Sequence, residues 1–311
     1  MKTILVTGSN GLLGQKIIYS LRGRNDVACI ATSIGANRLL AKDGYIYESL
    51  DVTDKNQVEK LVEQYRPDVI INTAAMTNVD ACETKKDEAV MLNVTAVQNF
   101  IDIISNLTLS GGTQNSIHFI HLSTDFVFDG TNGPYVEEDE TNPLSFYAQS
   151  KLDGERLLQK SNIKWTIIRT IIIYGVVDDN SRSNVVLWAK NSLEKKQTIR
   201  VINDQYRSPT LAEDLADACI SAALKEATGI YHVSGRETMC ILDMVKIVAD
   251  YFQLDPSFIQ PVSSTDLKQP AKRPPVTGFI ITKAIHDLDY HPRTFIEGLS
   301  IVKNQLEKIM A

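Results

Sequence analysis

The sequence lacks the features that mark secreted and membrane-bound proteins. Its 311 residues contain four cysteines, which lie far apart and show no metal-binding spacing. No apolar run approaches the length of a transmembrane span. The short apolar run after Met1 leads straight into a glycine turn, which is not typical of a signal peptide. We therefore predict a cytoplasmic protein with reduced cysteines, no membrane partner and no metal.

The sequence also lacks a surplus of basic residues. Its 32 Lys and Arg are outnumbered by 38 Asp and Glu, which gives a formal net charge of −6. A partner such as nucleic acid or an anionic membrane requires a basic face, so we predict no nucleic-acid partner. The contents of 43% hydrophobic and 23% charged residues are those of an ordinary globular protein. A local basic pocket for a phosphate group remains compatible with this composition.

Apolar segments rich in β-branched residues alternate with amphipathic segments from the first residue onward. Several of the apolar segments are continuous, as expected for strands that are covered on both faces. The predicted strands are Lys2–Thr7, Val27–Thr32, Ile46–Leu50, Val69–Thr73, Ile117–Ser123, Trp165–Ile172 and Gly229–Val233, and predicted helices include Leu12–Arg22, Lys55–Gln64, Glu88–Asn106 and Thr210–Leu224. This alternation predicts an α/β fold with a doubly wound parallel sheet.

A glycine motif follows the first predicted strand and opens the first predicted helix. It reads Gly8-Ser9-Asn10-Gly11-Leu12-Leu13-Gly14. Gly8 permits a tight turn, Gly11 a close approach of the pyrophosphate, and Gly14 close packing of the helix on the strand. In this position the motif predicts a dinucleotide site of the Rossmann type, with the pyrophosphate at the helix N-terminus.

The end of the second predicted strand carries no acidic residue. Sites for NAD usually place Asp or Glu there to bind the ribose 2′-hydroxyl. Here Ser33 follows the strand and Arg38 lies nearby, which favours the 2′-phosphate of NADP(H) and leaves NAD(H) open. The alternative is that Arg38 is a solvated surface residue. Asp51 and Val52, after the third strand, are candidates for contacts with the adenine.

The alternation of strands and helices becomes less regular after residue 174. We expect residues 1–174 to form the NAD(P)-binding Rossmann domain, to which residues 210–234 return with one helix and one strand. Residues 175–209 and 235–311 are expected to form a smaller, C-terminal substrate-binding domain over the carboxyl edge of the sheet. Ligands of open α/β sheets bind at that edge.

A tyrosine and a lysine in one predicted helix are candidates for proton transfer. Tyr147 and Lys151 are four residues apart and so share one helix face. Reduction of a ketone by hydride requires a proton donor, and a nearby ammonium lowers the pKa of a phenol. Upstream, Ser123 and Thr124 end an apolar strand, which places a hydroxyl where a substrate carbonyl would bind.

Further segments extend this pattern along the chain from Met1 to about Leu299. They are Asn72–Glu83 (NTAAMTNVDACE), Ser123–Gly130 (STDFVFDG), Arg169-Thr170, Asn203–Thr210 (NDQYRSPT) and Gly229–His232. Together with the glycine motif and the Tyr147–Lys151 pair, they resemble the extended short-chain dehydrogenase/reductases. Within that group the sequence resembles the dTDP-4-dehydrorhamnose reductases.

The resemblance implies reduction of the 4-keto group of a nucleotide-linked deoxysugar by NAD(P)H. Tyr147 would donate the proton, Lys151 would also hold the nicotinamide ribose, and Thr124 would tune the tyrosine and bind the substrate. The other implied roles are cofactor contacts at Ala74, Ala75 and Thr77, a water near Lys151 anchored by Asn93, and substrate contacts at Asp125, Arg207 and Arg273.

Three departures from the family pattern fall on the substrate side. Ile171-Ile172 stands where the family often has Ser-Trp, so an aromatic wall is missing. Arg207 takes the place of a glycine, and its interpretation is open between a diphosphate contact and a surface salt bridge. The Arg-Pro-x-x-Ser pattern appears as residues 273–277 and ends in Thr277.

Two other functions remain open alongside the reductase. An epimerase or dehydratase of the same fold would retain and recycle NAD, which the missing acidic residue disfavours. A non-catalytic nucleotide-sugar-binding regulatory subunit would not need the complete set of Thr124, Tyr147 and Lys151. The sequence leaves open whether the protein forms a homodimer.

Overall fold

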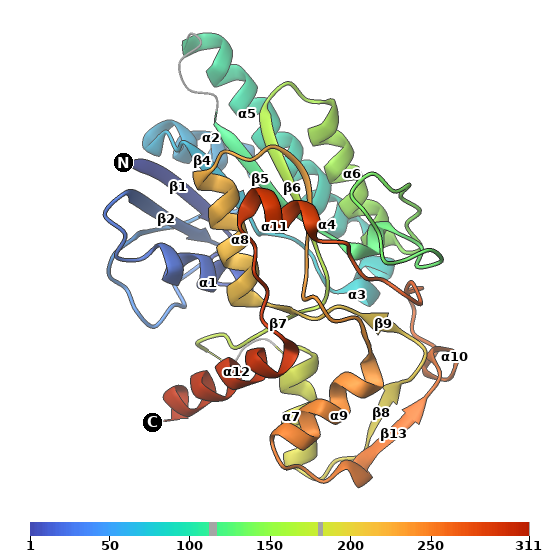
Figure 1. Ribbon diagram of the computed structural model, residues 1–311. Helices are drawn as coiled ribbons and strands as arrows, with labels where there is room; N and C mark the ends of the chain where they lie inside the picture. The colour runs from blue at the N-terminus through green and yellow to red at the C-terminus, as the bar shows by residue number, and fades with distance from the viewer. Residues whose placement is uncertain (112–116, 180–182, 311) are drawn as a thin grey trace.

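The computed structural model describes residues 1–111, 117–179 and 183–310 (Figure 1). Its centre is a seven-stranded parallel sheet with the order β11-β6-β5-β4-β1-β2-β3. The strands are β1 (Lys2–Thr7), β2 (Val27–Ser33), β3 (Ile46–Ser49), β4 (Val69–Asn72), β5 (His118–Thr124), β6 (Lys164–Thr170) and β11 (Gly229–Val233). The predicted doubly wound sheet is thus confirmed. The strand order reverses between β1 and β4, which is where such sheets bind dinucleotides.

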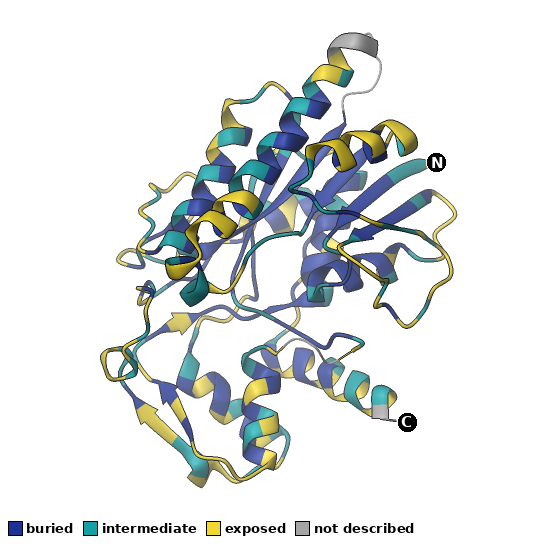
Figure 2. Cartoon of the chain, turned by 180° about the vertical axis from the view of Figure 1, so that it is seen from behind, coloured by how far each residue is buried: buried dark blue, intermediate teal, exposed yellow. Residues whose placement is uncertain are grey.

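Helices cover both faces of this sheet and bury two separate apolar cores (Figure 2). On one face lie α1 (Leu12–Leu21), α8 (Ala212–Leu224) and α11 (Thr282–Leu288); on the other lie α2 (Lys55–Tyr65), α5 (Ala96–Gly111) and α6 (Phe146–Lys160). The predicted helix Glu88–Asn106 is observed as α4 (Lys86–Val90), the π-helical turn η1 (Met91–Thr95) and α5, preceded by α3 (Val79–Thr84). The polar, glycine-rich composition of residues 108–116 predicts a surface loop; residues 108–111 belong to α5, and the rest lie outside the described residues.

A smaller unit with its own apolar core lies beyond the carboxyl ends of the strands (Figure 1). It contains α7 (Val185–Glu194), β8 (Ile199–Ile202), α9 (Ile241–Tyr251), η3 (Pro256–Phe258), β13 (Ile259–Val262), α10 (Ser264–Leu267) and α12 (Phe295–Met310). Short paired strands connect the two units: β7 (Ile173–Tyr174) with β10 (Thr210–Leu211), and β9 (Tyr206–Arg207) with β12 (Met239–Cys240).

The chain returns to the sheet twice rather than once. The first return brings α8 and β11, which lie in the predicted segment 210–234. The second brings Phe279, Ile281, Ala284 and Leu288, which pack in the same core as α1 and α8. This second return differs from the prediction, which placed the whole of 235–311 in the smaller unit. The segment is too short to show a periodicity of its own, so only its packing reveals the return.

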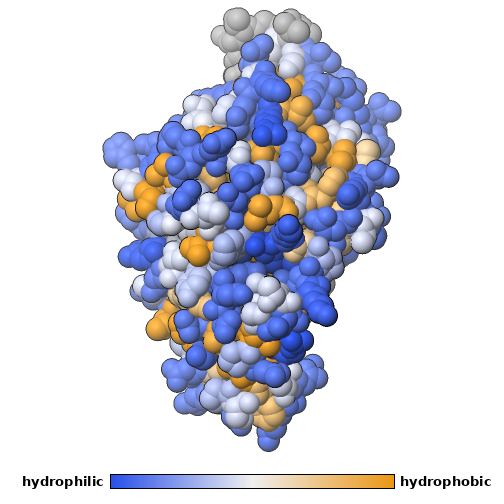
Figure 3. All heavy atoms as spheres, turned by 90° about the vertical axis from the view of Figure 1, so that its right-hand side faces the viewer, coloured by the Kyte–Doolittle hydropathy of each residue, from blue (hydrophilic) through white to orange (hydrophobic). Residues whose placement is uncertain are grey.

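The surface seen in Figure 3 is mainly hydrophilic, with apolar side chains in small separate groups. All four cysteines are free and buried. Within the described ranges, no helix combines the length and apolar character needed to cross a membrane.

Candidate active site

A pocket of about 690 Å³ lies along the carboxyl ends of the strands. Most of the residues predicted from the sequence to bind cofactor or substrate line it. They are Gly8, Asn10, Gly11, Leu12, Gly14, Ser33, Arg38, Val52, Ala74, Ala75, Thr77, Thr124, Asp125, Tyr147, Lys151 and Arg207. The structure therefore gathers residues from segments as distant as the glycine motif and β9 around one cavity.

The glycine motif forms a cradle at the start of α1. Gly8 has a φ of +67°, and a Cβ there would lie 2.7 Å from Thr73 Oγ1. A Cβ at Gly14 would lie 2.7 Å from Ser9 Cα and would also collide with the Gly8 carbonyl oxygen. The N-cap of α1 is Gly11, which provides no side-chain cap for the first N–H groups of the helix. These N–H groups suit a pyrophosphate, so the cradle fits a dinucleotide cofactor.

The loop that carries Arg38 is fixed against the glycine motif. Asn10 Oδ1 accepts from the backbone N–H of Arg38 over 2.9 Å, and its Nδ2 donates to the Ala36 carbonyl over 3.0 Å. The Arg38 side chain is 53% exposed, and its Nη1 lies 3.8 Å from Asp179 Oδ2. Ser33 and Arg38 both line the pocket, and Arg38 belongs to the loop that Asn10 fixes.

Two predicted cofactor residues do not line the pocket. The carboxylate of Asp51 accepts from the N–H of Thr53 over 2.9 Å and from its hydroxyl over 2.7 Å, so it closes a turn. The amide of Asn93 binds Met76 and Ser150: its Oδ1 accepts from Met76 N over 2.9 Å, and its Nδ2 lies 2.9 Å from Ser150 Oγ. Both side chains are engaged in fixing the backbone and neighbouring side chains rather than facing the cofactor space.

Tyr147 and Lys151 enter the pocket from α6. Ser145 caps this helix, because its side chain accepts from the N–H of Ala148 over 3.3 Å. The cap fixes the start of the helix, so Tyr147 and Lys151 follow one turn apart on its inner face. Thr124, the last residue of β5, meets the same pocket from the sheet. All three side chains belong to buried residues.

Burial sets the protonation states of this pair. Burial raises the pKa of Tyr147 well above its ordinary value, while a hydrogen bond with Thr124 lowers it to a smaller extent and the charge of Asp125 raises it further. Burial lowers the pKa of Lys151 to about 8, and the charge of Glu155 opposes this effect. The net shift of the Tyr147 pKa is therefore upward, whereas the sequence-based expectation is that the charge of Lys151 lowers it. At neutral pH the phenol remains protonated and able to donate a proton.

The nearest polar partner of Lys151 was not predicted from the sequence. His121 Nε2 lies 3.3 Å from Lys151 Nζ, and burial together with the lysine charge lowers the pKa of His121. From the sequence alone, His121 is interpreted as a hydrogen-bonded core histidine at the end of an apolar strand. It is indeed buried, but the alternation of side chains along β5 places it beneath α6, where it meets the lysine.

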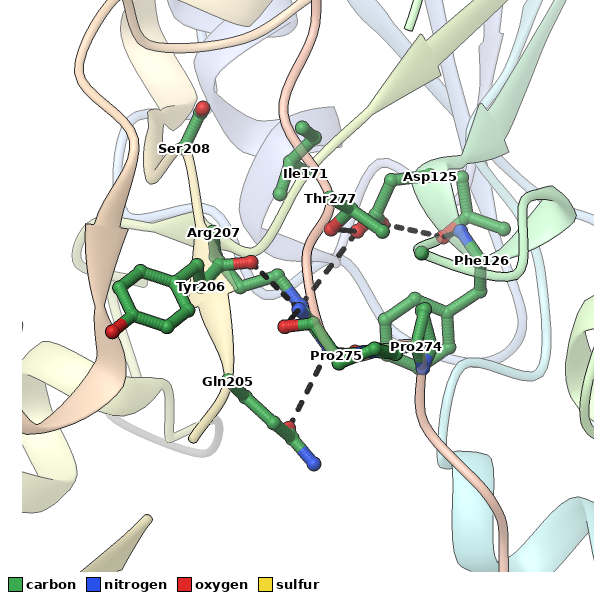
Figure 4. A network of polar contacts seen from close by, with 12 residues as sticks. Asp125, Phe126, Ile171, Gln205, Tyr206, Arg207, Ser208, Pro274, Pro275 and Thr277 are labelled. Carbon is green, nitrogen blue, oxygen red and sulfur yellow. Dashed lines mark hydrogen bonds and ion pairs between the residues drawn. The ribbon is translucent and has the colours of Figure 1, made fainter. Parts of the chain in front are cut away.

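On the substrate side, Arg207 joins three segments of the chain (Figure 4). Its Nη1 donates to the Tyr206 carbonyl over 2.7 Å and its Nη2 to the Pro274 carbonyl over 2.6 Å. Its Nε lies 3.8 Å from Asp125 Oδ2, and Thr277 donates its hydroxyl hydrogen to the same carboxylate. The guanidinium also lies over the ring of Phe126, 5.4 Å from its centre. Arg207 is buried, so it is not a surface salt bridge. It also lines the pocket, and the contact with a diphosphate stays a prediction.

Arg273, the remaining predicted substrate contact, lies outside the pocket. Its Nη2 lies 2.7 Å from Asp80 Oδ2 and its Nη1 lies 3.0 Å from Asp80 Oδ1. This ion pair lowers the pKa of Asp80 and attaches the segment before Pro274 to α3. The prediction of a substrate contact at Arg273 is therefore replaced by an ion pair that holds the segment in place.

Comparison with known proteins identifies relatives of the whole chain. The family model "RmlD substrate binding domain" matches residues 1–308. The methionine adenosyltransferase 2 subunit beta of Pongo abelii is 31% identical over 269 residues, which cover 85% of this chain and 76% of that protein.

Solved structures show the same fold. A dTDP-4-dehydrorhamnose reductase from Clostridium acetobutylicum superimposes with a TM-score of 0.82 at 28% identity and covers 98% of this chain and 99% of its own. The dTDP-4-dehydrorhamnose reductase from Bacillus anthracis, solved in complex with NADP, gives a TM-score of 0.80 at 25% identity over 98% of this chain and 100% of its own. The chain therefore belongs to the RmlD substrate-binding-domain family of extended short-chain dehydrogenase/reductases.

Proposed function

We propose that the protein reduces the 4-keto group of a nucleotide-linked deoxysugar with a nicotinamide cofactor and that Tyr147 donates the proton. The observation that carries this proposal is the convergence of Thr124, Tyr147 and Lys151 on the pocket that also contains the glycine cradle. A pure binding site has no need of a buried proton donor beside the cofactor cradle. The relatives that are dTDP-4-dehydrorhamnose reductases support the substrate class.

The cofactor, when bound, supplies the hydride, and the chain's own residues manage the proton. Thr124 binds the substrate carbonyl oxygen and orients the Tyr147 hydroxyl toward it. The raised pKa of Tyr147 keeps its proton in place until the carbonyl oxygen gains negative charge. Lys151 is charged below about pH 8, where it holds the nicotinamide ribose and stabilises the phenolate that proton transfer leaves behind.

We propose NADP(H) as the preferred cofactor, with NAD(H) as a weaker substitute. Ser33 and Arg38 line the pocket, and a hydroxyl and a guanidinium group suit a 2′-phosphate. Among the described residues that line the pocket, Asp125 is the one carboxylate, and it follows β5 on the substrate side. Asp179, which is not part of that lining, lies 3.8 Å from Arg38, so a bound phosphate would compete with it for the guanidinium.

The test is consumption of NADPH and NADH with a panel of 4-keto-deoxysugar nucleotides. Tyr147→Phe should bind NADPH like the wild type, whereas its rate of reduction should fall by at least ~100-fold because the proton donor is lost. Tyr231→Phe is the matched control, since Tyr231 is equally buried but donates to Asp287 on the far side of the sheet. Normal turnover in the Tyr147 variant would contradict the assigned role.

A second candidate function is that of a non-catalytic subunit. It is favoured by the 31% identity to the methionine adenosyltransferase 2 subunit beta, whose name describes a component of a larger enzyme. A partner that co-purifies in a fixed ratio, together with no turnover on any substrate of the panel, would support this function. Tightly bound NAD released on denaturation would instead favour an epimerase or dehydratase.

A further inference from the structure

A row of buried polar side chains crosses the sheet beneath the pocket. Thr7, Asn72 and His121 lie in register on the neighbouring strands β1, β4 and β5. Thr7 Oγ1 donates to Asn72 Oδ1 over 2.6 Å, and Asn72 Nδ2 lies 3.2 Å from His121 Nδ1. The row ends where His121 Nε2 meets Lys151 Nζ at 3.3 Å. It thus connects the residue before the glycine cradle to the lysine of the candidate active site.

Among the described residues, His121 is the side chain that contacts Lys151 within hydrogen-bond distance. The other charged or titratable groups near the lysine act on it without such a contact. Glu155 follows one turn later on α6 and raises the pKa of the lysine, but its carboxylate is bound to Arg169 of β6, with Nη2 and Oε2 2.7 Å apart. Tyr147 lies one turn earlier and is neutral at physiological pH. Because burial keeps the imidazole of His121 neutral, it can accept from the ammonium or donate to the amine.

The hydrogen bonds of the row depend on the charge of Lys151. When the Asn72 amide donates to Nδ1, the neutral imidazole carries its hydrogen on Nε2, which suits an uncharged lysine amine. When the amide is turned over, its NH2 group donates to Thr7 Oγ1, Nδ1 of His121 donates to the amide oxygen, and Nε2 accepts from the lysine ammonium. Each charge state of Lys151 therefore goes with one orientation of the Asn72 amide and one tautomer of the His121 imidazole.

We propose that His121 is a positioning residue that holds the Lys151 ammonium at the pocket and links its charge to the Asn72–Thr7 row. The role of Lys151 in turnover rests on the proposed function, whereas the contact with His121 belongs to the folded chain itself. Without the imidazole, the ammonium would lose the hydrogen-bond acceptor that His121 provides among the described residues, so the neutral amine would become more stable.

The experiment is an NMR titration of isotope-labelled lysine side chains, in which the Lys151 signal is assigned by its loss in Lys151→Arg. In His121→Leu the pKa of Lys151 should fall from about 8 by about 1–2, as expected for the loss of a hydrogen bond to a charged group. In His121→Gln the pKa of Lys151 should stay close to its wild-type value, because the amide oxygen of the glutamine can accept in place of Nε2. His118→Leu is the matched control, since His118 is buried on the same strand but contacts Thr166 at 2.7 Å.

Asn72→Asp provides a second, opposite test that leaves the histidine in place. A carboxylate at position 72 accepts from Nδ1–H, so Nε2 becomes an acceptor and the pKa of Lys151 should rise. An unchanged lysine pKa in both His121→Leu and Asn72→Asp would overturn the proposal, as would an equal fall in His118→Leu. If the shifts appear but the wild type reduces no ketone, the positioning role stands and the proposed reductase function fails.

Discussion

Replacement of Arg207 by methionine should destabilise the protein more than it weakens substrate binding. Methionine keeps much of the length of arginine but leaves the buried Asp125 without an opposing charge and the Tyr206 and Pro274 carbonyls without their donors. Removal of one partner of a buried pair costs about 3–5 kcal/mol. With an unfolding entropy of about 2.1 cal/mol/K per residue, a chain of 311 residues would lose about 5–8 °C in Tm.

Thermal unfolding followed by circular dichroism or calorimetry measures this loss directly. The Tm of Arg207→Lys should lie between that of the wild type and that of Arg207→Met, because a single ammonium cannot reach all of the acceptors that the planar guanidinium reaches. Arg38→Met is the control, since it makes the same chemical change in the same pocket at a half-exposed side chain. A Tm within about 1 °C of the wild type, together with a roughly tenfold rise in KM, would refute this reasoning and show that Arg207 is free to bind substrate.

Three further predictions concern the cofactor side. Arg38→Ala should raise the Kd of NADPH about tenfold more than that of NADH in fluorescence titrations, because a charged hydrogen bond is lost; equal weakening would remove the reason to prefer NADPH. Gly14→Ala should lower the Tm and abolish cofactor binding, since its Cβ would lie 2.7 Å from Ser9 Cα; wild-type binding would mean that α1 shifts freely. Turnover should decline as the pH rises through about 8, because the Lys151 ammonium loses its proton there while Tyr147 keeps its own. Lys151→Arg should move this decline to higher pH, and a wild-type profile in that variant would assign the decline to another group.

Much of the sheet could be predicted because several of its strands are continuously apolar. The predicted strand Ile117–Ser123 is observed at His118–Thr124, and Gly229–Val233 is observed with the same bounds. The two-residue strands β7, β9, β10 and β12 carry no such signal. Their pairing depends on segments far away in the sequence, so no local pattern indicates it. The same applies to the second return of the chain at α11.

The residues of the candidate site could be predicted from the sequence where the backbone geometry of a turn, or the position at the end of a strand, fixes their place. Glycines in a tight turn and hydroxyl residues at the end of an apolar strand lie at the carboxyl edge in any doubly wound sheet. The exceptions are side chains whose partners come from elsewhere in the fold. Asn93 and Arg273 carry suitable polar groups, but Met76 and Asp80 engage them. Asp51 differs, because its partner Thr53 lies in the same local turn. His121 is the reverse case, because its partner on α6 becomes evident only when the helix lies over β5.

The two halves of the pocket therefore differ in what fixes their shape, and this has a consequence for function. The cofactor half depends on the backbone of one local motif, which tolerates no Cβ at Gly14. The substrate half depends on Arg207, Asp125 and Thr277, which come from three distant segments and hold one another in place. A substitution at Thr277 should accordingly change the choice of substrate while leaving the Kd of NADPH unchanged. Because the departures from the family pattern fall on this half, we expect the wall braced by Arg207 to determine which sugar of the proposed substrate class is accepted.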